Sequence, residues 1–280
     1  MAVIESLIDR YLWFVHLDRR MPLDLDLGPL HIHLYSRAVF FMWVTAALLA
    51  TSAPVLAQSP AGDWRQTVFL YGMGAMIEGD AQVGPLQVPV DVGLSDFFDV
   101  LKFGGMAAYR VENDDWSFSG DVTYMNLGGS KTTQQGRASA GLDVEQMTVM
   151  ATAGRRILPH LEALLSLAYF DVDADARVRL LQQVRTASRD ASWVDALVGL
   201  NYEVPLGSKW RYTLRGDIGG LGSDLTWHAL TKVTYQSSER FGWYAGYRVI
   251  AYDYEDGQGL NYQHYDLRQH GPGVGIAIGF

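Results

Sequence analysis

Hydrophobic and polar side chains alternate with a period of two over most of the chain. In the segment WRYTLRGDIGG, Trp210, Leu214 and Ile218 fall on one face. Arg211 and Asp217 fall on the opposite face, and the segments WVDALVGLNYEV and WSFSGDVTYMNL alternate in the same way. Because successive side chains of a β-strand point to opposite sides, this period predicts strands with one apolar and one polar face.

The lengths of the strands and of their connections favour a membrane barrel over a soluble β-sandwich. The alternating segments run for roughly 10–14 residues, which suits a tilted membrane strand. Trp116, Trp210 and Trp243 follow short turns, where an aromatic girdle at a membrane interface is expected. The short turns are ENDD, LPH, PLGSK and SSER, and the longer loops fall at about 79–101, 129–141, 175–191, 221–224 and 255–260.

The alternation of short and long connections predicts an all-β fold, a closed antiparallel up-and-down transmembrane barrel of about ten strands. The even number returns both ends of the barrel to the periplasmic side, and closure removes the strand edges that lipid cannot satisfy. The predicted strands are 64–78, 102–112, 116–128, 142–155, 161–174, 192–204, 210–220, 225–236, 241–254 and 261–280.

One long apolar run, AVFFMWVTAALLA, precedes the alternating region and extends from Ala38 to Ala50. At about 13 residues it is shorter than the roughly 20 that a membrane-spanning helix needs. Small residues at 55 and 57 are typical of a signal-peptidase site, so cleavage is expected after Ala57. We therefore expect a leader and signal peptide at 1–57, which is removed, and an outer-membrane barrel at 58–280.

Composition removes several classes of function. The formal net charge of −9 argues against binding to nucleic acid. The absence of cysteine excludes disulfides, thiolate chemistry and cysteine-ligated zinc sites. The sequence contains no GxSxG, HExxH or P-loop motif. We therefore expect no metal, no cofactor and no catalytic residue.

The last residues, HGPGVGIAIGF, alternate glycine or alanine with large apolar side chains. We expect the large side chains to face lipid and to form the signal that outer-membrane barrel-assembly machinery recognises in its substrates. The residues of this expected assembly signal are Val274, Ile276, Ile278 and Phe280.

If the alternation of lipid-facing and lumen-facing residues continued unchanged toward the start of this strand, Asp266, Arg268 and His270 would lie in lipid. A basic residue at mid-depth of the membrane costs about 2–4 kcal/mol. Pro272 lacks an N–H group and the flanking glycines permit unusual dihedral angles, so the sequence predicts a β-bulge near Gly271–Gly273. The bulge would turn the three ionisable side chains into the lumen.

Two parts of the sequence resemble a family of bacterial outer-membrane β-barrel proteins. The first is VDVGLSDFFDVLKFGGMAAYRVENDDWSFSGDVTYMNL. The second comprises WVDALVGLNYEVPLGSKWRYTLRGDIGGLGSDLTWHAL, GYRVIAYDYEDG and the final HGPGVGIAIGF. The resemblance covers most of the chain from Trp64 to Phe280 and implies an integral location in the outer membrane rather than a particular activity. Ala277 and Gly279 depart from the family, which more often carries larger residues there.

The polar faces of the predicted strands place charges of both signs in the lumen. Arg215 and Arg248 are expected to pair with Asp195, Asp217 or Asp266, and such pairs would largely fill a ten-stranded barrel. The leading interpretation is therefore a structural or narrow-pore outer-membrane protein that is not an enzyme. The predicted lumen network consists of Asp195, Arg215, Asp217, Arg248, Asp266, Arg268 and His270.

Two alternatives remain open from the sequence. His264 and Asp266 lie on one face near the outer end of the last strand, with Asp224 and His228 near the adjoining rim, as a surface hydrolase could require. The long outer loops could instead serve an adhesin or binding barrel. Leu94, Phe97, Phe98 and Leu101 have helical spacing in the first of these loops, and four arginines occupy the third.

Several partners are expected. The arginines of the third loop could pair with phosphates of lipopolysaccharide, and the outer face should contact outer-membrane lipid. We also expect the barrel-assembly machinery to be a partner, and we expect the protein to be a monomer.

Overall fold

The computed structural model describes residues 24–26, 31–33, 64–83, 86–132, 138–180 and 183–280. The predicted signal peptide and its cleavage after Ala57 lie outside the described residues. A short antiparallel pair, β1 (Asp24–Asp26) and β2 (His31–His33), precedes the barrel in the sequence. Among the described residues, no helix is long and apolar enough to cross a membrane.

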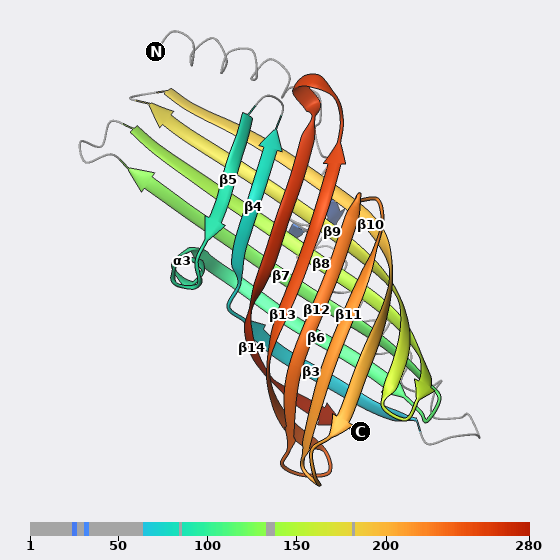
Figure 1. Ribbon diagram of the computed structural model, residues 1–280. Helices are drawn as coiled ribbons and strands as arrows, with labels where there is room; N and C mark the ends of the chain where they lie inside the picture. Colours follow the sequence, from blue (N-terminus) through green and yellow to red (C-terminus); the bar gives the residue numbers. More distant parts are fainter. Residues whose placement is uncertain (1–23, 27–30, 34–63, 84–85, 133–137, 181–182) are drawn as a thin grey trace.

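The barrel is one antiparallel sheet that closes on itself through β14 (Figure 1). Each strand pairs with its sequence neighbour from β6 to β14, and β14 returns to pair with β3 and β4. The strands are β3 (Arg65–Met73), β4 (Met76–Val83), β5 (Leu86–Val92), β6 (Leu101–Glu112), β7 (Trp116–Thr132), β8 (Ala138–Leu158), β9 (Leu161–Leu180), β10 (Gln183–Pro205), β11 (Trp210–Leu221), β12 (Leu225–Gln236), β13 (Phe241–Asp256) and β14 (Gln263–Gly279).

The closed barrel has ten strands when β3 and β4 are counted as one. These two segments pair with β14 in a single register, with Met73 opposite Gly273 and Met76 opposite His270. The ladder is interrupted at Pro272, which has no N–H to donate but whose carbonyl accepts a hydrogen bond from Gly74 N at 3.0 Å. The prediction of a closed ten-stranded barrel is confirmed, and β5 is an additional strand on the edge of β4.

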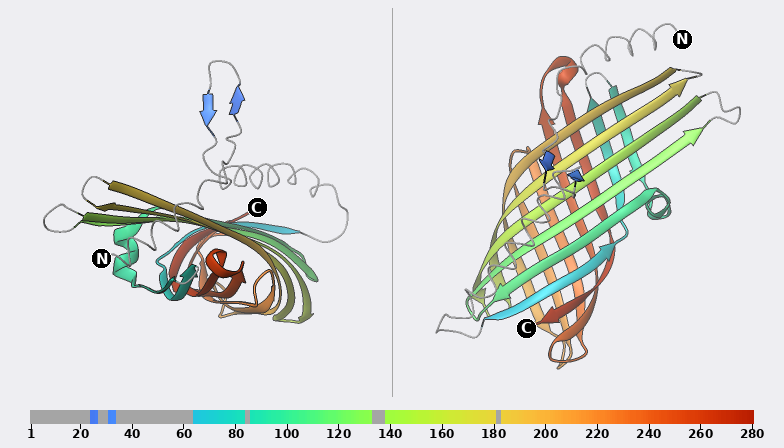
Figure 2. Two further views of the ribbon diagram at one scale, coloured as in Figure 1. Left: turned by 90° about the horizontal axis from the view of Figure 1, so that it is seen from above. Right: turned by 180° about the vertical axis from the view of Figure 1, so that it is seen from behind.

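Three strands are much longer than the sequence predicted. β8, β9 and β10 have 21, 20 and 23 residues, and they project beyond the rest of the barrel (Figure 2). The predicted loops at 129–141 and 175–191 are therefore mostly strand, with Arg177 paired to Thr186. The prediction was wrong because these segments are rich in polar and charged residues, which a strand that extends past the membrane can carry.

The expected alternation of apolar and polar faces is confirmed on the barrel wall. Side chains such as Leu167, Val198 and Ile218 are more than half exposed on the outside. The inward neighbours Ser166 and Asp217 are buried. An exposed apolar outer face around a polar interior is the arrangement of a membrane barrel rather than of a soluble one.

An aromatic belt surrounds one end of the barrel, which we call the turn end because the short connections 113–115, 159–160, 206–209 and 237–240 lie there. Trp116, Trp210 and Trp243 are 43%, 49% and 56% exposed. Trp210 packs on Tyr235 at 4.8 Å between ring centroids. These amphipathic rings suit the interface between lipid and water.

The two faces of β14 explain why small and large residues alternate along it. Val274, Ile276 and Ile278 face outward, and the small residues face the lumen. A Cβ added at Gly275 would lie 2.7 Å from the ring of Tyr244 and from Tyr71 Cβ. The small inward face is therefore the surface on which aromatic side chains of neighbouring strands pack.

The predicted β-bulge near Gly271–Gly273 is absent, so that prediction was wrong. β13 and β14 pair in one unbroken register from Asp256 opposite Gln263 to Phe241 opposite Ile278. β14 has 17 residues, so its length is about 55 Å, whereas the apolar band of a membrane barrel is roughly 25 Å tall. Apolar outward residues end near Pro272, and the strand continues in the same phase above the band, so no flip is needed.

Candidate functional site

A cavity of about 530 Å³ occupies the half of the barrel interior nearest the turn end. Its mouth is lined by the turn residues 207–210 and 239–240 and by Phe280. Its inner boundary is formed by the side chains of Asp121, Arg215, His228 and Arg248. Those four residues belong to four different strands, which makes this level of the barrel the natural place to look for a site.

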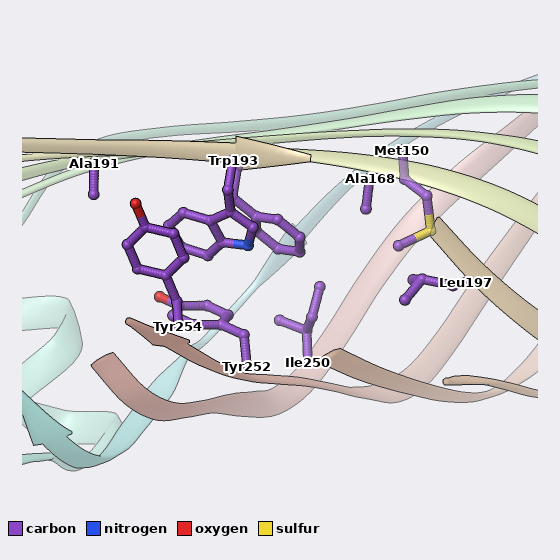
Figure 3. Close-up of a cluster of buried hydrophobic side chains, with 9 residues drawn as sticks. Met150, Ala168, Ala191, Trp193, Leu197, Ile250, Tyr252 and Tyr254 are labelled. Atoms are coloured by element: carbon purple, nitrogen blue, oxygen red, sulfur yellow. The ribbon is translucent and has the colours of Figure 1, made fainter. Parts of the chain in front are cut away.

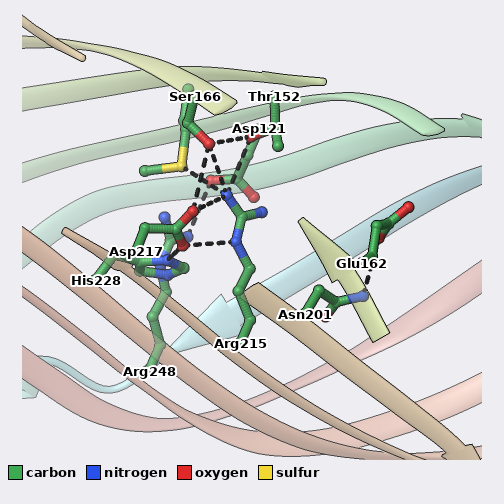
Figure 4. A network of polar contacts seen from close by, with 10 residues as sticks. Asp121, Thr152, Glu162, Ser166, Asn201, Arg215, Asp217, His228 and Arg248 are labelled. Atoms are coloured by element: carbon green, nitrogen blue, oxygen red, sulfur yellow. Dashed lines mark hydrogen bonds and ion pairs between the residues drawn. The ribbon is translucent and has the colours of Figure 1, made fainter. Parts of the chain in front are cut away.

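Asp217 organises the first half of this inner boundary (Figure 4). Its Oδ2 atom accepts a hydrogen bond from Arg215 Nε at 2.7 Å and lies 2.9 Å from His228 Nδ1. Arg215 Nη2 also donates to Thr152 Oγ1 at 3.0 Å and to Ser166 Oγ at 3.1 Å. Because Arg215 is on β11 whereas Thr152 is on β8, these bonds bridge non-adjacent strands across the lumen.

Arg248 organises the second half. Its Nη1 atom donates to Asp121 Oδ1 at 2.9 Å and to the hydroxyl of Tyr71 at 2.7 Å. The Tyr71 hydroxyl in turn donates to Asp121 Oδ2 at 2.7 Å. Asp121 is on β7 and Arg248 on β13, so this triad also spans the barrel. We call the two halves together the lumen network: Asp121, Arg248, Tyr71, Arg215, Asp217, His228, Thr152 and Ser166.

A third polar group lies nearer the turn end. Glu162 accepts hydrogen bonds from Arg110 Nη2 at 3.0 Å and from Asn201 Nδ2 at 3.2 Å. Arg110 Nε also donates to Glu112 at 2.9 Å. A buried carboxylate that accepts hydrogen bonds from an arginine and an amide is well satisfied, so this group serves as a structural link between β6, β9 and β10.

An apolar cluster fills the lumen beyond the network (Figure 3). The rings of Trp193 and Tyr254 stack at 4.2 Å between centroids, and Trp193 lies 5.0 Å from both Phe170 and Tyr252. We call this group the aromatic cluster: Met150, Ala168, Phe170, Ala191, Trp193, Leu197, Ile250, Tyr252 and Tyr254, all buried. Met150 Sδ lies 3.5 Å from Arg215 Nη2, so the aromatic cluster and the lumen network are in contact.

Asp195, predicted as a lumen charge, faces inward but pairs with no cation among the residues described. Its carboxylate accepts hydrogen bonds from the Gly222 and Ser223 backbone N–H groups at 3.1 and 2.9 Å and from Thr226 Oγ1 at 2.6 Å. Trp193 Nε1 donates to the same carboxylate at 3.1 Å. Asp195 therefore holds the turn between β11 and β12.

The other three predicted lumen residues, Asp266, Arg268 and His270, face the outside, because the strand keeps its phase without a bulge. The guanidinium of Arg268 lies 6.0 Å from the Trp227 ring. His270 Nε2 lies 3.4 Å from a carboxylate oxygen of Glu78. Their assignment to the lumen was wrong.

The sequence reasoning missed several residues of the interior. Tyr71, Glu162 and Lys232 were not singled out, and His228 was assigned to the outer rim rather than to Asp217. For β12, the period of two along the strand could have identified the inward residues. Once Thr226 is known to face inward, the even-numbered positions of that strand, His228 and Lys232 included, must face inward too.

The predicted rim group around His264 is not assembled as expected. His264 Nε2 lies 2.8 Å from Asp253 Oδ1 on the neighbouring strand, and no contact with Asp266 is described. His228 is buried in the lumen, so it takes no part in a group at the rim. Among the described residues, no group of three or more His, Asp or Glu side chains could hold a metal ion.

The helix expected in the first long loop is α3 (Leu94–Val100). Phe97 is 1% exposed and packs with Met106 and Met125 in a second apolar group inside the barrel wall. Phe98, the next residue, is 60% exposed. The helix therefore packs against its own barrel with one side chain and presents its neighbour outward.

No protein-family model matches the chain, and no curated protein matches it. Solved structures that align with it are bacterial outer-membrane proteins. The translocator domain of the autotransporter NalP from Neisseria meningitidis is 13% identical, with 86% of this chain and 96% of that chain covered and a TM-score of 0.46. The outer membrane protease OmpT from Escherichia coli is 7% identical, with 80% and 99% covered and a TM-score of 0.49. The attachment invasion locus protein Ail of Yersinia pestis is 13% identical, with 79% and 100% covered and a TM-score of 0.37.

The class of protein rests on this chain's own features. The sheet closes without a free edge at the turn end, the outer face carries exposed apolar side chains and an aromatic belt, and the lumen holds paired charges. Together these features define an integral β-barrel protein of the bacterial outer membrane.

Proposed function

We propose that this protein is a plugged outer-membrane barrel with a structural role, and that it forms no open channel. One observation carries the proposal: the lumen network and the aromatic cluster lie in contact, one behind the other, across the barrel interior. Ten strands enclose little more space than side chains can fill, so two stacked layers of side chains are sufficient to close the lumen.

The other expected properties belong to the same proposal. Val274, Ile276, Ile278 and Phe280 act as the signal for barrel-assembly machinery, and the protein is a monomer surrounded by outer-membrane lipid and lipopolysaccharide. The outward position of Val274, Ile276 and Ile278 supports this role, because assembly machinery must reach them from the lipid side.

A liposome-swelling assay with a small sugar as the permeant tests the proposal. Protein purified from membranes is reconstituted into liposomes that are then diluted into isotonic L-arabinose. We expect no swelling above that of protein-free liposomes, whereas a general porin reconstituted at the same density produces rapid swelling. Swelling by this protein at a rate near that of the porin would refute the plugged barrel and favour a pore.

A further inference from the structure

The cavity at the turn end has a charge opposite to that of the whole chain. Eight Lys and Arg side chains line it, against four Asp and Glu, although the chain carries a formal net charge of −9. An excess of one sign of charge in a cleft attracts ions of the opposite sign. The cavity is therefore suited to an anion.

Most of the arginines around the cavity already have carboxylate partners. Arg248 pairs with Asp121 at 2.9 Å, and Arg211 pairs with Glu203 at 3.0 Å. Lys232 differs from them, because within the described part of the chain it makes no ion pair or hydrogen bond. Its charge is the one best placed to receive a partner from outside the chain.

The surroundings of Lys232 hold its ammonium in place without neutralising it. Nζ lies 4.5 Å from the centroid of the Phe69 ring and 5.4 Å from that of Tyr244. Ring faces attract a cation, but they accept none of its three hydrogen bonds in the way that an anionic oxygen does. Lys232 lies on the inward face of β12 and lines the cavity, so its free donors can reach a molecule inside it.

The cavity also provides room and an apolar wall. Its volume of about 530 Å³ is typical of sites for small molecules. Leu230 lies two positions from Lys232 on the same face of β12, and Leu164 lines the cavity from β9. A ligand with one charged group and one apolar part would satisfy both kinds of wall.

We propose that the cavity binds a small organic anion, whose carboxylate or phosphate group accepts hydrogen bonds from Lys232 and whose apolar part lies against Leu164 and Leu230. The ligand enters at the turn end, which we assign to the periplasmic side. The site does not require a conducting barrel, because its inner boundary is the lumen network.

Isothermal titration calorimetry on the purified protein in lipid nanodiscs tests the site with four probes: benzoate, phenyl phosphate, inorganic phosphate and the neutral benzyl alcohol. We expect both organic anions to bind and the two other probes to bind much more weakly. Lys232→Met preserves the packing on Phe69 but removes the charge, so it should weaken benzoate binding by about tenfold or more. Lys209→Met removes a charge at the cavity mouth and should change the affinity less than Lys232→Met does.

A second measurement keeps the test valid if Lys232→Met fails to fold. Lysines of the unaltered protein are dimethylated with formaldehyde and a reductant, and each is quantified by peptide mass spectrometry. Benzoate should protect Lys232 and leave Lys209 unchanged. Equal protection of both lysines, equal affinity in Lys232→Met, or binding of benzyl alcohol as tight as that of benzoate would overturn the proposal. Inorganic phosphate binding as tightly as phenyl phosphate would overturn the organic part of it.

Discussion

The two halves of the barrel interior are built from the same strands but by different physical means. On β13, Arg248 faces the half nearest the turn end and is held by Asp121 and Tyr71, whereas Tyr252 faces the other half and packs on rings. On β9, Ser166 belongs to the lumen network and Phe170 to the aromatic cluster. One half is thus a charged network with an open cavity, and the other is a core of packed rings and aliphatic side chains.

Under the proposed function, two layers of different chemistry close the same lumen. The aromatic cluster is stabilised by buried apolar area, which has no directional requirement. The lumen network depends on each partner being present, because a buried charge that loses its partner is left uncompensated. The two layers should therefore respond differently to the same kind of substitution.

The largest effect should follow removal of the central ring of the aromatic cluster. Trp193→Ala deletes a side chain that contacts three other rings, and we expect the free energy of unfolding to fall by about 3–5 kcal/mol. This free energy is measured by urea unfolding in lipid vesicles, with the folded fraction monitored by its gel mobility. Trp210→Ala, in the exposed belt, is the control and should cost much less; equal losses would mean that the aromatic cluster is not a core.

A somewhat smaller effect should follow loss of one charge from the lumen network. Asp217→Ala leaves Arg215 without its carboxylate, and we expect a loss of about 3 kcal/mol in the same assay. The double variant Asp217→Leu with Arg215→Met removes both charges, so it should be more stable than Asp217→Ala alone. A double variant that is less stable than the single one would show that the pair is not a buried ion pair of this kind.

Gly275→Ala tests the packing of aromatic rings on the last strand. The added Cβ would lie 2.7 Å from the Tyr244 ring and 2.6 Å from the carbonyl oxygen of Leu70, so we expect a loss of about 1–3 kcal/mol. Gly216→Ala is the matched control, because a Cβ there would have no atom within 4 Å. Equal stability of the two variants would contradict the proposed packing role of the small inward face.

Arg268→Ala should have the smallest effect. The side chain lies outside the barrel against Trp227 and above the apolar band, so its removal should cost no more than about 1 kcal/mol. A loss as large as that of Asp217→Ala would place Arg268 inside the lumen after all and would restore the predicted bulge.

The sequence predicted the barrel, its strand faces and the aromatic belt, because all three follow from a period of two and from the positions of the turns. It predicted Arg215, Asp217 and Arg248 in the lumen for the same reason. It included Asp217 among the expected partners of Arg215, and the two residues do pair. It could not predict the partners of Arg248, since which inward side chains meet across a lumen depends on the curvature and stagger of the sheet. Thus Arg248 meets Asp121 and Tyr71 rather than Asp266.

The errors have a common physical origin. If the membrane covers the full length of each strand, polar outward residues such as Arg268 require a flip, and charge-rich segments such as 175–191 are expected to be loops. Strands that run well beyond the apolar band remove both requirements, because their outer faces meet water there. A charge-rich sequence can still be a strand when its neighbours are strands.

Single-channel conductance in planar bilayers tests the central claim of double closure most directly. The wild-type protein should be silent, and the double variant Asp121→Ala, Arg248→Ala should remain silent because the aromatic cluster still closes the lumen. Adding Trp193→Ala and Tyr252→Ala to that variant, with folding checked by gel mobility, should produce steady conductance. Steady conductance by the wild-type protein would contradict the account.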